Sequence, residues 1–210
     1  PATGDMRIRA DFDQPVWVRP SDYRWVDSPM PGVQRMMLDR VGDEVARATS
    51  LVRYQPGATF SRHTHGGGEE IFVLEGAFGD EHGVYPAGSY LRNPIGSAHT
   101  PRVGPEGALI WVKLHQFAAD DQAQFVVNDA RPGVLHQHDS DSACETVSLI
   151  DLDGLLAVDP QGDEVLVLSG VLDWNGEHFE AGSWLRLPRG TRAHFSGEPG
   201  TRVLRKTGHL

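Results

Sequence analysis

The sequence predicts an all-β protein made of two related small β-barrels in tandem. Three observations support this fold class. The chain aligns with itself without a gap at an offset of 94 residues, its apolar runs are short, and its 24 glycines and 14 prolines are scattered singly between those runs. Short apolar runs bounded by turn residues are typical of buried strands rather than helices. No segment predicts a helix of more than three turns.

The internal repeat is strongest between residues 70–96 and 164–190, where the turn residues are kept. Glu-Glu-Ile-Phe-Val-Leu-Glu-Gly in the first copy corresponds to Asp-Glu-Val-Leu-Val-Leu-Ser-Gly in the second. The first-copy residues that recur at the offset are Glu70, Val73, Leu74, Gly76, Ala87, Gly88, Ser89, Leu91, Arg92, Pro94 and Gly96. Such a repeat predicts two copies of one supersecondary unit.

The elements predict a boundary between the two copies. Residues 16–33 contain three short apolar or turn segments that we interpret as lead-in strands of the first barrel, which extends over residues 1–117. Residues 118–131 are polar and are expected to form a linker, with a loop or short helix at its start. The second barrel extends over residues 132–210 and begins with a Pro-Gly-Val segment that echoes the last lead-in segment.

One stretch of the first copy carries the chemistry. His63 and His65 are one residue apart on an extended segment, so their imidazoles point to the same face. Three glycines follow, which let the chain turn back, and then comes Glu69. His99 ends a downstream pattern, Gly-x5-Pro-x-Gly-x2-His. Imidazoles and a carboxylate in this combination suit iron, zinc, manganese or nickel, so the sequence predicts one divalent metal ion bound by His63, His65, Glu69 and His99.

These residues resemble the two signatures of the cupin superfamily, Gly-x5-His-x-His-x3-4-Glu-x6-Gly and Gly-x5-Pro-x-Gly-x2-His-x3-Asn. The resemblance implies jelly-roll barrels, also called double-stranded β-helices, and makes the whole chain a bicupin. The final Asn of the second signature is replaced by Val103. Glu70 is an alternative ligand because some cupins have four residues before the Glu. Only Glu69 leaves six residues before Gly76, and strand neighbours face opposite ways, so we predict Glu69.

The second copy lacks the ligands. At the offset of 94 residues, the positions of the four predicted ligands are occupied by Ala157, Asp159, Asp163 and Ala193. Two carboxylates do not replace three imidazoles at a selective site. Another His-x-His pair begins at His136, but no glutamate follows it at the proper spacing. We therefore predict a second barrel without a metal, kept for packing against the first.

The first copy also resembles, over residues 25–117, the cupin domain of ChrR-type anti-sigma factors. In that family the cupin binds zinc through residues that match His63, His65, Glu69 and His99, and it is linked to sensing of oxidative stress. Sigma-factor binding resides there in a separate N-terminal domain with its own His/Cys zinc site. Here about 25 residues without a cysteine precede the cupin, so that domain, and the sigma-binding role, are not expected.

Two classes of function follow. The first is an enzyme, a mononuclear non-haem iron dioxygenase acting on a diketone or aromatic ketone. The second is a non-catalytic metal or redox sensor, which the absence of a Cys-x-x-Cys pair disfavours. Residues expected in or near strands that line the barrel mouth are Arg53, Tyr54, Arg62, Tyr90 and Trp111. The alternatives are surface ion pairs for the arginines and packing between the barrels for Tyr90 and Trp111.

Composition limits the partners. The formal net charge is −10 and no block of Lys or Arg occurs, which argues against nucleic acid or an anionic membrane as a partner. No apolar run approaches the length that spans a bilayer. Cys144 is the only cysteine, so no internal disulfide forms, as fits the cytoplasm. We expect a small-molecule substrate and a monomer or homodimer.

Overall fold

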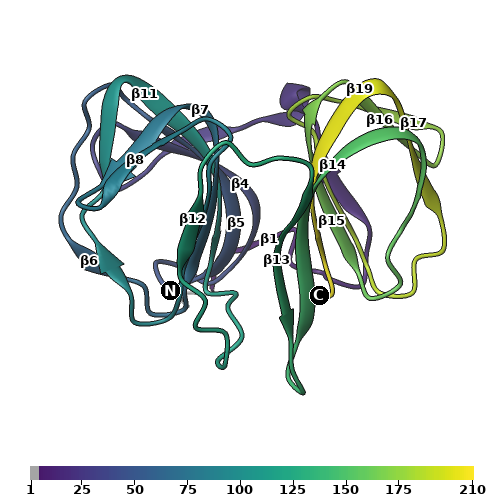
Figure 1. The fold of residues 1–210 in the computed structure, drawn as a ribbon, viewed down its shortest axis with the longest axis horizontal. Helices are drawn as coiled ribbons and strands as arrows, with labels where there is room; N and C mark the ends of the chain where they lie inside the picture. Colours follow the sequence, from purple (N-terminus) through teal and green to yellow (C-terminus); the bar gives the residue numbers. More distant parts are fainter. Residues whose placement is uncertain (1–4) are drawn as a thin grey trace. The chain divides into compact units, whose positions relative to one another are not determined.

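The computed structural model describes residues 5–210 and divides the chain into two compact units (Figure 1). Unit 1 contains residues 5–10 and Arg24–Ala130, and unit 2 contains Asp11–Tyr23 and Arg131–Leu210. The prediction of an all-β protein is confirmed. Within the described residues a single 3-10 turn, η1 (Pro20–Asp22), is the only helical element. No helix in this part of the chain has the length and apolar character needed to cross a membrane.

Unit 1 is built from one large and one small antiparallel sheet. The large sheet follows the order β1-β4-β5-β11-β7-β9-β12, with β3 paired to β4 and β8 paired to β7, and the small sheet joins β6 to β10. The strands are β1 (Arg7–Ile8), β3 (Trp25–Asp27), β4 (Val33–Val41), β5 (Arg47–Tyr54), β6 (His63–Thr64), β7 (Glu69–Asp80), β8 (Gly83–Pro86), β9 (Tyr90–Asn93), β10 (Ala98–His99), β11 (Arg102–Leu114) and β12 (Phe125–Val127).

Unit 2 is built from one antiparallel sheet of order β13-β14-β19-β15-β18-β2, with β16 paired to both β17 and β19. The strands are β2 (Val16–Val18), β13 (Gly133–Asp139), β14 (Cys144–Ala157), β15 (Asp163–Ser169), β16 (Val171–Trp174), β17 (Glu177–Glu180), β18 (Trp184–Leu187) and β19 (His194–Thr207). This order corresponds strand by strand to β4-β5-β11-β7-β9-β12 of unit 1, as the internal repeat requires.

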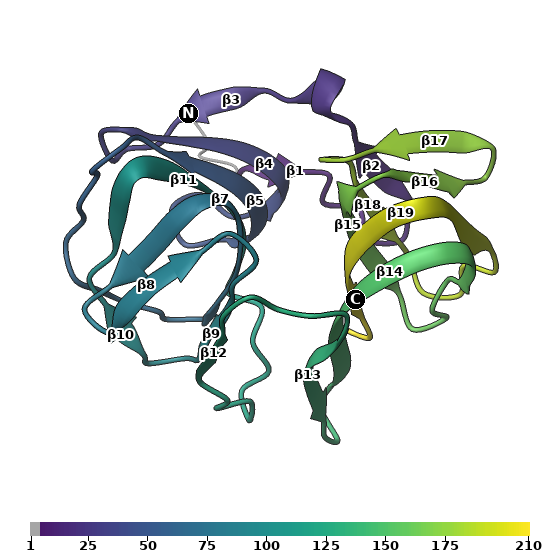
Figure 2. The same ribbon diagram turned by 45° about the horizontal axis from the view of Figure 1, so that its top comes forward.

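The expected domain boundaries need two corrections. Strand β2 was expected to lead into the first barrel, but it pairs with β18 and belongs to unit 2 (Figure 2). Residues 118–131 were expected to be a linker, yet β12 within them pairs with β9 of unit 1. The reason is the same in both units: β9 and β18 would otherwise be sheet edges with unpaired backbone groups. In unit 1, β9 pairs with β12, which follows it in the chain. In unit 2, β18 pairs with β2, which comes from the N-terminal part of the chain.

Each unit has its own apolar interior, around which its strands curl (Figure 1). In unit 1, Ile71 and Val73 of β7 face Ile110 and Val112 of β11 in this core, which alternation along the strands explains. Their sequence neighbours on β7 are buried as well, so β7 is covered on both faces. That is why the sequence shows a continuous apolar run instead of an alternating one.

The second face of the unit 1 sheet carries a buried row of charges. Glu70 lies opposite Arg92 on one neighbouring strand and opposite Lys113 on the other. Arg92 contacts Glu70 directly and donates to Asp121 at 2.6 Å, and the hydroxyl of Tyr90 donates to Glu70 at 2.8 Å. Buried charges need such partners to offset their desolvation. Unit 2 repeats this row, with Glu164 opposite Arg186 and Lys206.

Candidate metal centre

The small sheet brings the three histidines together. The register of β6 and β10 places His99 opposite His63, and the backbone N–H of His65 donates to the carbonyl of Ser97 at 2.8 Å. A tight turn from Pro94 to Ser97 precedes β10 and has Gly96 at φ +86°, which favours glycine. The two histidine signatures therefore share one ladder, although His65 and His99 are 34 residues apart in sequence.

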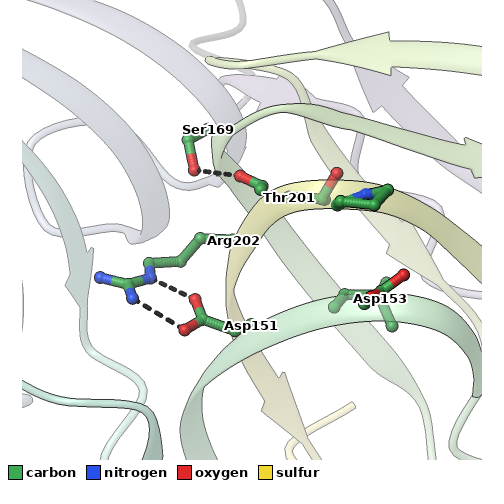
Figure 3. Close-up of a pocket in the computed structure, with 8 residues that line it drawn as sticks. Asp151, Asp153, Ser169, Thr201 and Arg202 are labelled. Carbon is green, nitrogen blue, oxygen red and sulfur yellow. Dashed lines mark hydrogen bonds and ion pairs between the residues drawn. The ribbon is translucent and has the colours of Figure 1, made fainter.

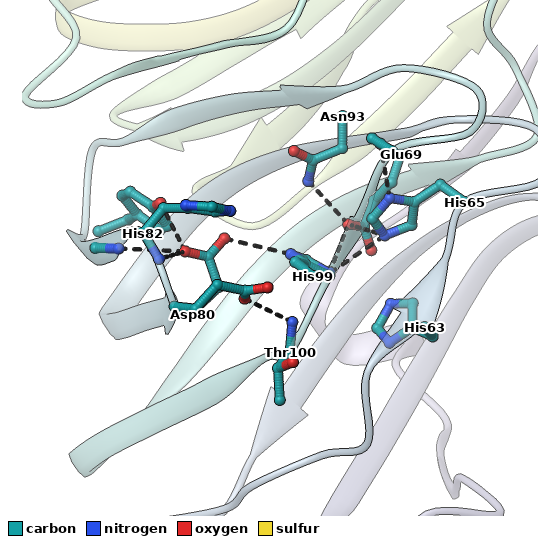
Figure 4. A network of polar contacts seen from close by, with 12 residues as sticks. His63, His65, Glu69, Asp80, His82, Asn93, His99 and Thr100 are labelled. Carbon is teal, nitrogen blue, oxygen red and sulfur yellow. Dashed lines mark hydrogen bonds and ion pairs between the residues drawn. The ribbon is translucent and has the colours of Figure 1, made fainter.

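The donor atoms of all four predicted ligands converge (Figure 4). Ligand atoms of His63, His65, Glu69 and His99 lie within 4.8 Å of one another. The Nε2 atoms of His65 and His99 are 3.2 Å apart, and Oε2 of Glu69 is 3.0 Å from the first and 3.4 Å from the second. Donor atoms held at about 2.0–2.2 Å from one metal ion are themselves about 3.0–3.5 Å apart, so the spacing suits a single ion.

Each imidazole is oriented through its other nitrogen. Nδ1 of His63 lies 3.3 Å from the carbonyl of Ser61, and Nδ1 of His65 lies 3.1 Å from the hydroxyl of Ser97. That hydroxyl donates its own proton to a backbone carbonyl, so it accepts from His65. Nδ1 of His99 lies 3.4 Å from Oδ2 of Asp80. All three partners are acceptors, which places the proton on Nδ1 and leaves Nε2 with its lone pair toward the centre.

Glu69 is held in place by strand pairing. It lies opposite Asn93 in the register of β7 with β9, and the Asn93 amide donates to Glu69 Oε2 at 3.1 Å. Burial alone would raise the pKa of Glu69. In the metal-free site a hydrogen bond from His65, the positive charge of His65 and His99 when they are protonated, and a hydrogen bond from Asn93 outweigh burial and lower this pKa below its usual value. Burial also lowers the pKa of His99, with Glu69 and Asp80 opposing that shift. Metal binding requires the carboxylate together with neutral imidazoles, and a metal ion would then supply the positive charge that the protonated histidines otherwise provide.

Two of the three glycines before Glu69, Gly67 and Gly68, are required by packing. A Cβ on Gly67 would collide with His115, and a Cβ on Gly68 would collide with the ring of Phe117. The backbone of this loop also bonds to the same segment, because the N–H of His115 donates to the carbonyl of Gly68 at 3.2 Å. Gly68 adopts φ +81°, a conformation that side chains rarely tolerate. The glycines thus let the loop lie flat against residues 115–117 and fix the start of β7.

The donor set fits a metal ion on its chemistry as well as its spacing. Two Nε2 lone pairs that face each other at 3.2 Å repel unless a cation or a proton lies between them. Three imidazoles and one carboxylate are borderline ligands suited to divalent iron, nickel, manganese or zinc. Glu69 is 9% exposed and His99 3% exposed, whereas His63 is exposed at the mouth of the site. The centre is therefore largely screened from water on the side of His99 and open at His63.

Comparison with family models decides the family. Residues 13–118, half of the chain, match the model described as the ChrR cupin-like domain. The chain belongs to the ChrR cupin-like family. A search of curated proteins gave no significant match. The resemblance predicted from the two signatures is confirmed at the level of the family.

Solved structures similar to this cupin share its fold. A provisionally assigned dioxygenase from Nostoc punctiforme has 17% sequence identity and a TM-score of 0.71, with 94% of this chain and 84% of that chain covered. The bacterial pirin YhhW from Escherichia coli, in complex with nickel(II), has 13% identity and a TM-score of 0.67, with 94% and 100% covered. A point mutant of oxalate decarboxylase OxdC from Bacillus subtilis has 13% identity and a TM-score of 0.56, with 92% and 77% covered.

Four of the five residues expected near the barrel mouth lie away from the centre. Arg62 is a surface residue that pairs with Glu81 at 2.8 Å, and Arg53 donates to Gln34 at 2.5 Å and stacks on Trp25. Tyr90 lies on the charged face of the sheet beside Glu70. Trp111 faces the same way, since its strand neighbours Ile110 and Val112 point into the core. The strand pairings decide which half of the candidates face inward, and a single sequence does not show them.

Tyr54 is the candidate that lies beside the centre. Its ring contacts Phe60 at 5.3 Å and Phe78 at 5.8 Å between centroids, and Phe78 in turn lies 6.1 Å from the ring of His99. Burial, followed by the negative charge of Glu69, raises the pKa of the Tyr54 phenol. Tyr54 therefore stays protonated and belongs to an aromatic cluster that borders the candidate ligands.

Three polar residues at the site carry no motif signal. Asn93, Ser97 and Asp80 support Glu69, His65 and His99 respectively. Asp80 and Asn93 also line, with His82 and His99, a cavity of about 130 Å³ that adjoins the centre. Asn93 lies opposite Glu69 in the pairing of β7 with β9, so knowledge of this pairing would have identified it. The other two contacts arise from turns whose positions the sequence alone does not fix.

In unit 2 an arginine occupies the corresponding place. Arg205 of β19 lies opposite Val165, as Val112 of β11 lies opposite Ile71 in unit 1. Its guanidinium contacts both carboxylate oxygens of Asp163, at 3.0 and 2.5 Å, and donates to the carbonyl of Ala157 at 2.9 Å. Asp163 and Ala157 stand where Glu69 and His63 stand in unit 1. In unit 2 the guanidinium of Arg205 thus lies beside the carboxylate, at the place where the three histidines gather around Glu69 in unit 1.

Unit 2 also carries a hollow of about 310 Å³ (Figure 3). Its polar groups bond to one another: Arg202 donates to both oxygens of Asp151, at 2.5 and 2.9 Å, and the hydroxyl of Ser169 donates to the carbonyl of Gly200 at 2.9 Å. The hydrogen bonds from Arg202 lower the pKa of the exposed Asp151 carboxyl. These pairings leave the hollow without a convergent set of groups comparable to the centre in unit 1.

Proposed function

We propose that this protein is a bicupin, with a metal-binding first barrel and a second barrel that has no metal and serves the structure. The matched strand orders of the two units and the ion pair of Arg205 with Asp163 support this architecture. We further propose that the metal is bound by His63, His65, Glu69 and His99, one ion per chain.

The observation that carries the metal site is the orientation of the three imidazoles. Each has its Nδ1 beside an acceptor, and the Nε2 atoms of His65 and His99 face the same point as the Glu69 carboxylate. A histidine kept only for packing has no reason to present its lone pair to another histidine. Three such histidines around one buried carboxylate form a pre-organised ligand set.

We propose that the protein is a non-haem iron-type dioxygenase in the cytoplasm that acts on a small diketone or aromatic ketone. An iron(II) ion held by four protein ligands supplies open coordination positions and one-electron chemistry toward O2. The protein would supply an aromatic wall of Tyr54, Phe60 and Phe78 beside the site, with a protonated phenol able to donate to a substrate oxygen.

A second candidate function is supported by the family itself. Because the chain matches the ChrR cupin-like domain, a non-catalytic sensor of metal or oxidation state is the alternative. The same four ligands would then hold zinc as a structural or sensing ion. A sensor needs no route for substrate, whereas an enzyme does, so the two functions differ in what the loaded protein does with O2.

The test has two parts. Protein purified without added metal is analysed for metal content, and protein loaded with iron(II) or zinc is then assayed for oxygen uptake with a panel of diketones and phenolic ketones. The dioxygenase proposal expects uptake with iron(II) and none with zinc, since zinc has no accessible redox change. Two results together would favour the sensor. No compound supports oxygen uptake, and a partner protein binds this chain in only one of its metal-loaded or oxidation states.

A further inference from the structure

Asp80 stands between a turn and a metal-binding histidine. It ends β7 and is paired with Gly83 at the start of β8, so it opens the hairpin turn. It is 4% exposed. Its two carboxylate oxygens have separate partners, and this separation is the basis of the inference (Figure 4).

Oxygen Oδ1 of Asp80 serves the turn. It accepts from the backbone N–H of His82 at 2.8 Å, from that of Gly83 at 3.2 Å and from the hydroxyl of Tyr85 at 2.9 Å. An aspartate at the first position of a turn commonly bonds to N–H groups two and three residues on, so these contacts alone would explain its presence. The turn therefore makes no use of the second oxygen, Oδ2.

Oxygen Oδ2 faces the imidazole of His99. The Nδ1–Oδ2 distance is 3.4 Å, and on the opposite side of the ring Nε2 faces Glu69 and His65. A carboxylate accepts only, so it selects the tautomer of His99 that carries its proton on Nδ1. That tautomer is the one whose Nε2 binds a metal.

We propose that Asp80 is a positioning residue for the metal centre, which holds His99 in the metal-binding tautomer through Oδ2 while Oδ1 anchors the hairpin. The inference rests on the proposed metal site but concerns a residue outside the ligand set. Among the described partners of the three Nδ1 atoms, only that of His99 is a carboxylate; Nδ1 of His63 has a carbonyl and Nδ1 of His65 a hydroxyl. The hydroxyl of Ser97 could reverse its role by rotating, but a carboxylate cannot.

The substitution Asp80→Asn turns this geometry into a directional test. Three donors converge on Oδ1, so the amide oxygen of the new side chain must occupy that position. The amide NH2 group then occupies the position of Oδ2 and donates to Nδ1 of His99. His99 is forced to carry its proton on Nε2, where the metal would bind. The shape of the turn is kept, and only the tautomer is inverted.

The experiment measures tautomer and metal binding separately in the full chain. Imidazole ¹⁵N shifts of the metal-free protein, recorded at about pH 8 where histidines are neutral, report which nitrogen of His99 carries the proton. Competition with a chromophoric chelator gives the dissociation constant for zinc. We expect Asp80→Asn to move the proton of His99 to Nε2 and to raise this constant by about 10- to 100-fold.

Tyr85→Phe is the matched control, because it removes one donor from Oδ1 and leaves the carboxylate on His99. It is expected to keep the tautomer and to change the zinc dissociation constant by less than about threefold. A wild-type tautomer or wild-type affinity in Asp80→Asn overturns the proposal. Should that variant not fold, the wild-type spectrum decides, since a proton on Nε2 of His99 there also overturns it. A protein that binds no zinc but shows the inverted tautomer in the variant would refute the metal site and leave the positioning role intact.

Discussion

The ion pair of Arg205 with Asp163 offers a sharp test of the idea that unit 2 is structural. The Asp163 side chain is fully buried and that of Arg205 is 14% exposed. Replacing Arg205 by Met keeps most of the side-chain length but leaves the carboxylate with one remaining donor, the backbone N–H of Asp159 at 2.8 Å. Removal of one partner from a buried pair costs about 3–5 kcal/mol of folding free energy. This is a large part of the stability of a typical domain, about 5–15 kcal/mol.

The loss is expected to depend on pH, and its direction follows from burial. Burial raises the pKa of Asp163 above its usual value even though Arg205 opposes the shift. A carboxyl whose pKa is raised by folding contributes stability below its unfolded pKa and loses it as pH rises through the folded pKa. Without Arg205 the folded pKa rises further. The difference between wild type and Arg205→Met should therefore be larger near pH 7 than at about pH 4.5, because a carboxyl with a raised pKa takes up its proton sooner as the pH falls.

The assay is urea unfolding of the full chain at both pH values, followed by tryptophan fluorescence and by hydrogen exchange in β15 and β19. A second variant with Asp163→Leu added to Arg205→Met is the control, because replacing both members of a buried pair by apolar residues is often nearly neutral. It should recover most of the loss. A loss below about 1 kcal/mol at pH 7, or an equal loss at both pH values, would show that Arg205 does not compensate a buried charge.

Three further predictions follow from the fold and the centre. His65→Ala should abolish stoichiometric metal binding and remove the thermal stabilisation that added metal gives, which elemental analysis and melting curves check. Gly68→Ala should weaken zinc binding in a chelator competition, because the added carbon meets the ring of Phe117 and shifts the start of β7. Val18→Asp should destabilise unit 2 by more than about 2 kcal/mol and leave metal binding in unit 1 intact, whereas the same change at the exposed Val45 should alter neither stability nor metal binding.

The convergence of the four candidate ligands and the internal repeat could be predicted from the sequence because both leave local patterns. His63 and His65 are spaced by the strand period, and the choice of Glu69 over Glu70 depends only on alternation along β7. In the structure Glu69 faces His65 and His99, and Glu70 faces Arg92 on the other side of the sheet. Strand geometry fixes such relations within a few residues of chain.

The residues that were missed depend on pairings between distant strands. Nothing local distinguishes β2 from a lead-in strand of the first barrel, and its pairing with β18 joins residues more than 160 positions apart. The role of Arg205 was missed for a similar reason, because the register of β19 with β15 decides that it points toward Asp163. Whether Tyr54 or Trp111 faces the centre was likewise a question of register, which a one-residue shift would reverse.

The two units solve one electrostatic problem in two ways. Each unit buries a carboxylate at the start of a central strand, Glu69 on β7 and Asp163 on β15. A buried carboxylate needs a positive charge beside it. In unit 2 the guanidinium of Arg205 provides that positive charge. Unit 1 has Val112 at that place and instead gathers imidazoles with free lone pairs around the carboxylate. We therefore infer that a metal centre at this place needs an apolar residue at the position of Val112 as well as the four ligands, a combination that the first unit has.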